Sequence, residues 1–414
     1  MRKSIASGLG TDLLKHAFLA MERFGPDPTD VYFGVLLRCT GRVPTLDDLR
    51  AHIGGRLDRL PALTSRLTGE SEWEHDPHFD IADHVRPAPG VPVEPFPVRR
   101  LMDTAPGHEH PLWRAWLLQP GNGDAWGLAF TVHHAVLDGT GLLHALRVLF
   151  DDREPAPVVA RSPRALAAVR ALPNILGTLR PAPGLPVMGA LTGERRLDHA
   201  SVALANIRAV AEATGTTVGQ VHLAALAGAL REWSAAGTAV RDIPVCVPVD
   251  TRTSGERDLL GVHIGLHRAV LPTGTADPAE RLRIVARRLS RRRMAGARAA
   301  ARALAEDVPS RWSGEAIRRL GDRRAVALTA SVFRPSSPAA VLGSPVQDVF
   351  ALPWLPPGHG CFTILAVHGS VASLSVLTDT GVDATRDLSA LWAGEVTALG
   401  TAVGIRPART EPAI

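Results

Sequence analysis

The chain has 414 residues, of which 45% are hydrophobic and 21% are charged, and its formal net charge is +5. This composition is ordinary for a globular protein and the length favours two domains, while three widely spaced cysteines, Cys39, Cys246 and Cys361, exclude a disulfide framework and fit a reducing compartment. Because neither an apolar run of about eighteen residues nor a signal-peptide pattern occurs, we expect a cytoplasmic protein that does not span a membrane.

The N-terminal part of the chain predicts alternating helices and strands. Residues 10–23 are expected to form a short helix and residues 30–39 a strand. Thr45 can begin the next helix, whose inward-facing leucines recur at helical spacing until Pro61 ends it. The proline-rich residues 86–100 predict a loop.

A hairpin of two apolar strands follows. The strands are expected over residues 113–119 and 125–132, and the second is apolar, aromatic and β-branched enough to be buried on both faces. Gly139 breaks this pattern, and a helix with one apolar face follows. Its inward-facing residues are Leu142, Leu143, Leu146 and Leu149.

Two adjacent histidines, His133 and His134, lie in the bend between this strand and this helix. An imidazole can take a proton from an alcohol or amine at neutral pH and return it to a leaving group, so the pair predicts a general base. Asp138 can cap the helix and hold the loop, and Gly139 lets the chain turn sharply. A metal site is disfavoured, since neighbouring side chains point apart in an extended chain and no zinc-like spacing occurs nearby. The alternative is that both histidines are hydrogen-bonded core residues.

The segment HHAVLDG, from His133 to Gly139, resembles the HHxxxDG motif of the CoA-dependent acyltransferase and condensation-domain superfamily. Other segments of the N-terminal half resemble, in order and spacing, the bacterial wax ester synthase/diacylglycerol acyltransferase family. They are residues 49–67 (LRAHIGGRLDRLPALTSRL), Trp73 with residues 76–80 (DPHFD), residues 84–86 (HVR) and residues 111–113 (PLW). The chain is therefore identified as a divergent member of that family.

The resemblance implies an α/β (α+β) fold with two chloramphenicol acetyltransferase-like domains. Each would be a mixed sheet flanked by helices, with the active-site tunnel between the two. We assign residues 1–180 to the N-terminal acyltransferase domain, which carries the motif, and residues 181–414 to a C-terminal acyltransferase-like domain. Residues 151–196 are rich in proline and lack a sustained period, so they predict a crossover linker, with a helix at residues 164–169.

The C-terminal half again predicts alternating elements. Helices are expected over residues 204–215, 217–233 and 385–400, and strands over residues 243–249, 260–270, 361–367 and 370–377. The helix over residues 217–233 has a face of small residues suited to close packing.

A buried Asp138 would need a partner of opposite charge. In plant members of the superfamily an arginine just after a strand pairs with the motif aspartate, and Arg252 lies in that context. The resemblance therefore implies a structural pair of Asp138 and Arg252. The alternative is that Arg252 is a surface residue.

The second half departs from the lipid-synthesising branch at three places. Gly219-Gln220 replaces the usual Asn-Asp, Val262 replaces an asparagine, and residues 331–335 (SVFRP) stand where the family has Ser-Asn-Val-Pro-Gly-Pro. These changes remove polar residues from the expected cleft floor. The chemistry of the superfamily is therefore better supported than the lipid substrates of the branch.

Nine arginines and no acidic residue occur from Arg281 to Arg302. Leu282, Val285 and Leu289 can share one face, which predicts a basic amphipathic helix over the first half of this segment. Such a helix can make peripheral contact with a membrane or lipid surface, or meet the phosphates of CoA or a carrier arm; the alternative is a solvated surface helix. No nucleic-acid recognition motif accompanies it, so no nucleic-acid partner is expected.

The resemblance implies an O-acyltransferase of the EC 2.3.1 type, with His134 as general base. The expected reaction moves an acyl group from an acyl-CoA thioester, a co-substrate, to a hydroxyl or amine acceptor such as a long-chain alcohol or diacylglycerol. No acyl-enzyme, metal or other cofactor is expected. One alternative is a condensation enzyme that forms natural-product esters or amides from an acyl group on an acyl carrier protein. The other is a non-catalytic binding protein on the same fold.

Overall fold

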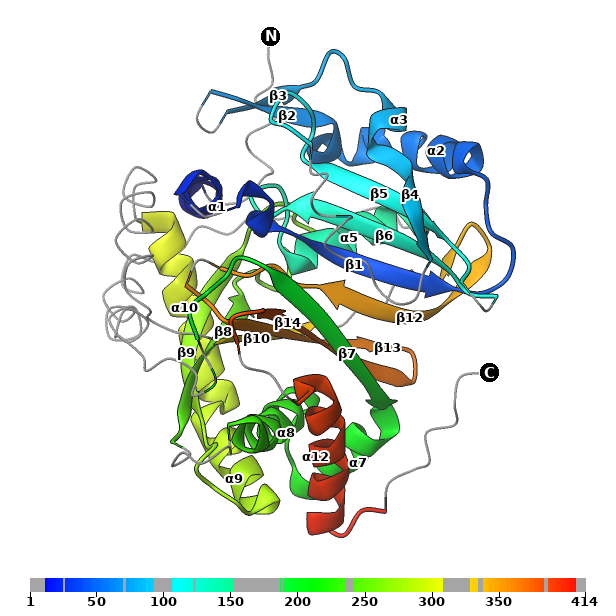
Figure 1. Cartoon of the computed structure of the whole chain (residues 1–414). Helices are drawn as coiled ribbons and strands as arrows, with labels where there is room; N and C mark the ends of the chain where they lie inside the picture. Colours follow the sequence, from blue (N-terminus) through cyan, green and yellow to red (C-terminus); the bar gives the residue numbers. More distant parts are fainter. Residues whose placement is uncertain are drawn as a thin grey trace.

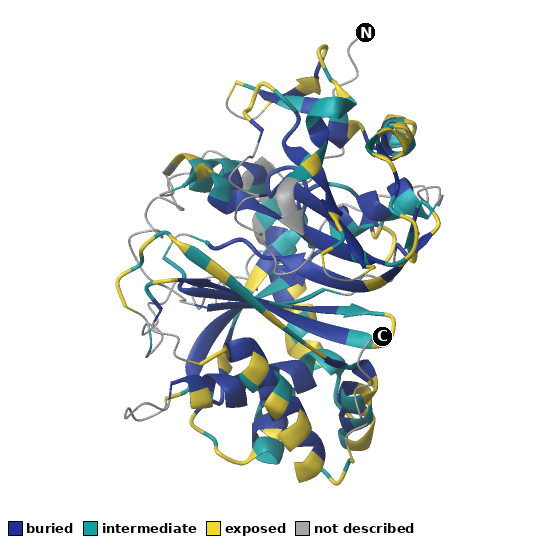
Figure 2. Cartoon of the chain, turned by 45° about the vertical axis from the view of Figure 1, so that its right-hand side comes forward, coloured by how far each residue is buried: buried dark blue, intermediate teal, exposed yellow. Residues whose placement is uncertain are grey.

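Two six-stranded sheets form the centre of the molecule, and Figure 1 shows one above the other in a computed structural model. The structure describes residues 12–24, 27–69, 72–92, 101, 106–121, 124–151, 187, 189–234, 241–307, 328–333, 338–356, 358–382 and 386–406. Figure 2 shows that the strands are mostly buried, whereas exposed residues gather on the helices and loops. The predicted fold class, two mixed sheets flanked by helices, is confirmed.

The first sheet has the strand order β11-β12-β1-β6-β5-β4. Its strands are β1 (Tyr32–Cys39), β4 (Val85–Pro92), β5 (Trp113–Gln119), β6 (Trp126–His133), β11 (Ala340–Val341) and β12 (Ser344–Leu352). Neighbouring strands are antiparallel except β4 and β5, which are parallel, so the sheet is mixed. Every residue of β6 is buried, as its apolar sequence predicts. Next to this sheet, β2 (Ser65–Thr68) and β3 (Glu72–His75) form a short antiparallel pair.

The prediction that residues 86–100 form a loop is wrong for its first part. Residues up to Pro92 belong to β4, which among the described strands pairs only with β5 and therefore lies at the edge of the sheet. An edge strand tolerates proline because one side of it needs no ladder hydrogen bonds. Residues 93–100 lie outside the part of the chain that the structure describes.

The helices of the N-terminal half largely follow the predicted pattern. They are α1 (Asp12–Phe24), α2 (Leu46–Gly54), α3 (Ile81–His84) and α5 (Gly139–Phe150), with 3-10 turns η2 (Pro28–Val31), η3 (Leu57–Arg59) and η4 (Pro61–Thr64). Thr45 caps α2 by accepting a hydrogen bond from the Asp48 amide. The expected end of this helix at Pro61 is wrong: α2 ends at Gly54, where two consecutive glycines have low helix propensity.

The second sheet has the order β7-β14-β13-β10-β8-β9. Its strands are β7 (Arg195–Ala203), β8 (Ile243–Asp250), β9 (Ile264–Leu271), β10 (Leu328–Phe333), β13 (Cys361–His368) and β14 (Val371–Asp379). The central strand β10 is parallel to both of its neighbours and the other pairs are antiparallel. The strand predicted from residue 260 begins only at Ile264, because the preceding residues reach over to the motif loop.

Helices cover the outer face of the second sheet. They are α7 (Leu204–Thr214), α8 (Val218–Trp233), α9 (Pro278–Arg288), α10 (Arg291–Asp307) and α12 (Leu388–Ala402). Figure 1 shows α7, α8 and α12 on the side that points away from the first sheet. The small residues of α8 are buried against this sheet and against α12, as their close spacing predicts.

The second half of the chain completes the first sheet. Strand β12 pairs with β1, from Gly34 opposite Leu352 to Cys39 opposite Val346. The second half of the chain therefore contributes strands to both sheets, and this links the two sheets covalently as well as through side-chain packing. The predicted crossover helix at residues 164–169 and the proposed boundary near residue 180 lie outside the described residues.

The predicted basic amphipathic helix over the first half of the arginine-rich segment is α9, in which Leu282 and Val285 are buried. A break at Leu289 and Ser290 separates it from α10, which holds the second half. Arg281 is 2% exposed and pairs with Glu395 of α12, while Arg302 pairs with Glu256. Among the described residues no helix is long and apolar enough to cross a bilayer.

The basic surface is consequently smaller than the sequence suggests. Its exposed members at the start of α10 are Arg291, Arg292, Arg293 and Arg298. The sequence could not separate these from the paired arginines Arg281 and Arg302, because the acidic partners of the latter lie far away in the chain.

The three cysteines are free, as predicted, and the structure buries all three. Burial raises the pKa of the Cys39 and Cys246 thiols to about 12 and raises that of Cys361 further. Each is therefore a neutral thiol at physiological pH, without the nucleophilic character of a thiolate.

His222 is expected to destabilise the second half of the fold. It is fully buried in α8, neither ring nitrogen has a hydrogen-bond partner in the described structure, and burial lowers its pKa to about 3. We expect His222→Leu to raise the free energy of unfolding by about 1–3 kcal/mol, because two unpaired polar atoms leave the core. Chemical denaturation at pH 7 measures this, and a loss of stability would contradict it.

The same substitution should flatten the acid limb of the stability curve. The unfolded chain protonates His222 near its ordinary pKa of about 6.5, whereas the folded chain resists protonation until about pH 3. Wild-type stability should therefore fall as the pH is lowered between these values, and His222→Leu should remove that contribution. His75→Leu, at an exposed histidine of β3, provides the control.

Candidate active site

The motif loop joins β6 to α5 and is fixed by backbone hydrogen bonds at both ends. The amide of His134 donates to the carbonyl of Val31 at 3.0 Å, and the amide of Asp138 donates to the carbonyl of Gly261 at 3.1 Å. Val31 lies in the first half of the chain and Gly261 in the second, so the loop is tied to both. Asp138 caps α5, since its carboxylate accepts from the Gly141 amide at 2.8 Å.

The structure brings Arg252 to the motif aspartate. Arg252 Nη1 lies 2.8 Å from Asp138 Oδ2, and both side chains are almost fully buried. The other guanidinium nitrogens donate to the carbonyls of Leu259 and Gly261 at 3.0 and 3.1 Å. Arg252 is thus an interior residue and not the surface arginine of the alternative interpretation.

Asp138 is held in its ionised form. Burial by itself would raise the pKa of this carboxyl, but the charge of Arg252 and three hydrogen bonds hold it below its ordinary value. One of these bonds comes from the His263 amide, which donates to Asp138 Oδ2 at 2.6 Å. Because the carboxylate stays charged at physiological pH, its contacts to both halves of the chain persist there.

Gly139 does not provide the sharp turn that the sequence predicts. Its φ is not in the left-handed region, and a Cβ at this position would be in ordinary contact, at 3.6 Å, with the Phe333 ring. The glycine with a conformational requirement is Gly261, whose φ of +88° turns its carbonyl toward Asp138 and Arg252. A helix can begin at residue 139 without a special backbone angle because Asp138 caps it.

His133 is fully buried, and its ring contacts the loop itself. His133 Nδ1 accepts a hydrogen bond from the amide of Ala135 at 2.9 Å, so the neutral ring carries its proton on Nε2. The Tyr32 ring meets it edge-on, with 5.1 Å between the ring centroids. Burial lowers the pKa of His133 and keeps it neutral. These contacts suit a side chain that holds the loop.

His134 has its ring enclosed by aromatic side chains. Phe18 of α1 stacks on it with a centroid distance of 4.1 Å and an interplanar angle of 5°, and Phe33 of β1 lies at 4.3 Å. Trp354, after β12, meets the ring edge-on at 5.2 Å. His134 is 6% exposed, and burial lowers its pKa to about 4. The ring is therefore a neutral imidazole at physiological pH, the form that accepts a proton.

The two histidines have different surroundings, as expected for neighbours at the end of a strand. Within the described ranges, no group of three or more histidine, cysteine, aspartate or glutamate side chains is arranged to hold a metal ion. The functional groups of the loop are its two imidazoles and the buried Asp138–Arg252 ion pair.

The residues that replace the family's polar positions have structural contacts. Gln220 forms a capping box with Thr217 at the start of α8 and donates to the Leu289 carbonyl at 3.0 Å. Val262 is fully buried in the core that includes the motif loop. Gln220 is therefore a helix-capping residue, and Val262 is an apolar packing residue in the core beside the motif loop.

Sequence reasoning missed the side chains that surround the histidines. Phe18 and Glu22 belong to α1, and Trp354 follows a strand more than two hundred residues after the motif. Helical spacing indicates that Phe18 and Glu22 share one face of α1, but it cannot indicate what that face covers. No local pattern marks Trp354 at all.

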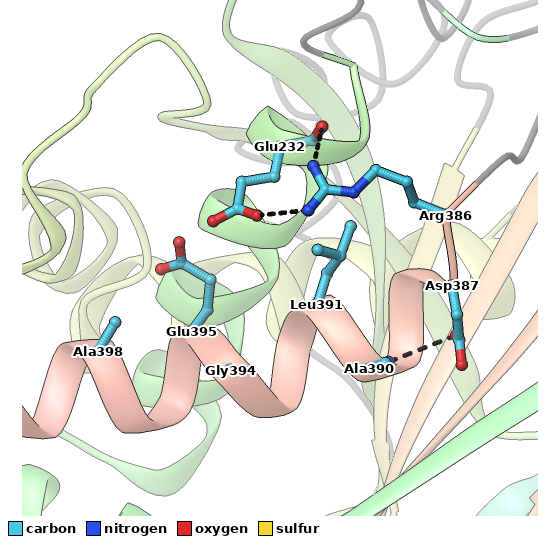
Figure 3. A pocket seen from close by; sticks show the side chains of 8 residues that line it. All are labelled: Glu232, Arg386, Asp387, Ala390, Leu391, Gly394, Glu395 and Ala398. Atoms are coloured by element: carbon cyan, nitrogen blue, oxygen red, sulfur yellow. Dashed lines mark hydrogen bonds and ion pairs between the residues drawn. The ribbon is translucent and has the colours of Figure 1, made fainter.

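A groove of about 550 Å³ lies between α8 and α12, and Figure 3 shows its lining. Its charged side chains include Glu232, Arg386 and Glu395, and Arg386 forms an ion pair with Glu232 at 3.2 Å. Since α8 and α12 lie on the outer face of the second sheet, this groove is remote from the motif loop (Figure 1). We assign it no part in the candidate active site.

Solved structures share this fold over nearly the whole chain. The first condensation domain of the calcium-dependent antibiotic synthetase has a TM-score of 0.68 at 20% identity, covering 97% of each chain. The wax ester synthase/diacylglycerol acyltransferase from Marinobacter aquaeolei VT8 has a TM-score of 0.59 at 21% identity, covering 91% of this chain and 95% of its own. The fold is thus that of the condensation-domain and acyltransferase class.

Sequence comparison identifies the particular family. The model of the wax ester synthase/diacylglycerol acyltransferase catalytic domain matches residues 38–179, and the model of the C-terminal domain of that family matches residues 260–392. The chain belongs to the wax ester synthase/diacylglycerol acyltransferase family, as the sequence predicted.

Two curated relatives of the chain are proteins of Mycobacterium tuberculosis. One, named as a putative diacylglycerol O-acyltransferase, is 29% identical over 51% of this chain and 55% of its own length. Another, named as a probable diacylglycerol O-acyltransferase, is 26% identical over 77% of this chain and 80% of its own length. The match thus spans only about half the length of the first of these relatives.

Proposed function

We propose that this protein transfers an acyl group from an acyl-CoA thioester to a hydroxyl acceptor such as a long-chain alcohol or diacylglycerol. The observation that carries the proposal is a neutral His134 on a loop locked by the Asp138–Arg252 pair. Membership of the family and the names of the mycobacterial relatives support the same reaction.

The proposed chemistry needs one base and no covalent intermediate. His134 takes the proton of the acceptor hydroxyl as the oxygen attacks the thioester carbonyl, and a tetrahedral intermediate forms. The carbon–sulfur bond then breaks, the ester is released, and the imidazolium returns its proton to the departing thiolate. The enclosure of His134 by aromatic rings excludes water, which would otherwise hydrolyse the thioester.

We further propose that the two reactants reach His134 from opposite sides, between the two sheets. The exposed arginines at the start of α10 are available for peripheral contact with an anionic lipid surface or with the phosphates of CoA. Arg281 and Arg302 take no part in this assignment, because buried carboxylates occupy them.

The proposal is tested by thiol release. Acyl-CoA donors from acetyl to palmitoyl are combined with long-chain alcohols and diacylglycerol, with His134→Ala as the blank. Turnover by the wild type that is absent from the blank supports acyl transfer and sets the donor length. If neither the wild type nor His134→Ala releases thiol, acyl groups loaded on acyl carrier proteins and small-molecule acceptors are tested next. The enzymatic proposal would be rejected if the protein binds a ligand but turns over none of the donor and acceptor combinations.

A further inference from the structure

Glu22, near the end of α1, lies between the first motif histidine and a histidine of the loop before β5. Glu22 Oε2 is 3.4 Å from His133 Nε2, and both carboxylate oxygens are 2.9 Å from His108 Nε2. The side chain of Glu22 is 13% exposed, that of His133 is 0% and that of His108 is 47%. A carboxylate from a different part of the chain thus reaches the buried motif.

This carboxylate is ionised throughout the physiological range. Burial would raise the pKa of Glu22, but the hydrogen bonds with His108 and the nearby ring of His133 lower it to about 2. Glu22 in turn raises the pKa of His108, whereas burial keeps the pKa of His133 low. Glu22 therefore offers a charged acceptor to a buried, neutral His133.

The orientation of His133 is determined from both sides of its ring. Since Nδ1 accepts from the Ala135 amide, the proton lies on Nε2, the atom that points to Glu22. Partners on opposite edges of one imidazole leave it a single tautomer and a single rotamer. Ala135 directly follows His134, so the orientation of His133 also fixes the backbone next to the proposed base.

The same face of α1 contacts both motif histidines. Phe18 is one helical turn before Glu22 and stacks on His134, while Glu22 reaches His133. The contact of Phe18 with His134 is stacking of two rings, which orients His134 but does not reach His133. The carboxylate of Glu22 supplies the contact with His133.

We propose that Glu22 is a positioning residue of the active site. Its carboxylate faces the His133 Nε2–H across 3.4 Å, and this polar contact holds the ring that accepts from the Ala135 amide and thereby the backbone from which His134 projects. The inference rests on the proposed function for its kinetic consequence, but its structural consequence can be measured without any substrate.

The kinetic test compares Glu22→Ala with Glu22→Gln. Glu22→Ala is expected to lower kcat about 10–100-fold with KM changed less than about threefold, because the base is misplaced while the substrate sites remain. Glu22→Gln keeps an oxygen acceptor for His133 and should stay within about fivefold of the wild-type kcat. Glu74→Gln, which removes an exposed carboxylate paired with Arg66 at 2.9 Å, should leave kcat unchanged. Each kcat is calculated from the concentration of folded protein, so that a loss of folded protein is not counted as a loss of activity.

The structural test is hydrogen exchange followed by mass spectrometry on the whole chain. Glu22→Ala should speed exchange of the peptide spanning residues 131–141 by about tenfold and leave the α12 peptide unchanged, while Glu22→Gln and Glu74→Gln match the wild type. Unchanged exchange of the motif peptide in Glu22→Ala would overturn the inference, as would equal kinetic losses in the alanine and glutamine variants. If the wild type has no turnover, the proposed function fails, and hydrogen exchange still decides the role of Glu22.

Discussion

Replacing His134 by alanine is expected to lower turnover about 10²–10⁴-fold, the range that a positioned general base contributes. The variant should fold, because the cavity is lined by Phe18, Phe33 and Trp354, which keep their other packing contacts. Thiol release with the best acyl-CoA donor measures the loss, and circular dichroism reports the fold. His75→Ala, at an exposed histidine of β3, should keep wild-type activity. Near-normal turnover in His134→Ala would show that His134 is not the general base.

The pH dependence provides an independent check on the same residue. Because burial lowers the pKa of His134 to about 4, the ring is already neutral, and competent as a base, well below pH 7. We expect kcat/KM to stay level from about pH 8 down to about pH 5 and to fall as His134 becomes protonated at lower pH. A fall centred at the ordinary histidine pKa of about 6.5 would show that the ring is better solvated in the free enzyme than in this structure.

Arg252→Met should be the most destabilising single change at the site. It leaves Asp138 charged and buried without its cation, and such a loss costs about 3–5 kcal/mol of unfolding free energy. The guanidinium also no longer donates to the carbonyls of Leu259 and Gly261, which loosens the segment that contacts the motif loop, so kcat should fall at least about tenfold. Chemical denaturation and thiol release measure the two effects.

Two comparisons make this prediction specific. Arg288→Met removes a half-exposed pair with Asp242 and should cost no more than about 1 kcal/mol. Adding Asp138→Asn to Arg252→Met removes the uncompensated charge, so it should restore part of the stability without restoring turnover. If Arg252→Met costs no more than Arg288→Met, the buried pair does not hold the loop.

The sequence by itself determined the local structure and the motif. Apolar, β-branched segments predicted β5, β6, β8, β13 and β14 nearly to their ends, because a strand buried on both faces must be apolar along its length. The histidine pair, the Asp138 cap and the family were also evident, because they depend on residues close together in the chain. Even the Asp138–Arg252 contact followed from a resemblance in which each residue has a recognisable local context.

The tertiary structure alone decided which distant residues meet. The arginines of residues 281–302 look alike in sequence, yet Arg281 is buried against Glu395 and Arg291 is exposed, since burial depends on the elements packed against each helix face. In the same way, α1 and the segment after β12 bring Phe18, Glu22 and Trp354 to the motif histidines. Periodicity specifies which residues of an element share a face, but only the packing of the whole chain specifies what that face contacts.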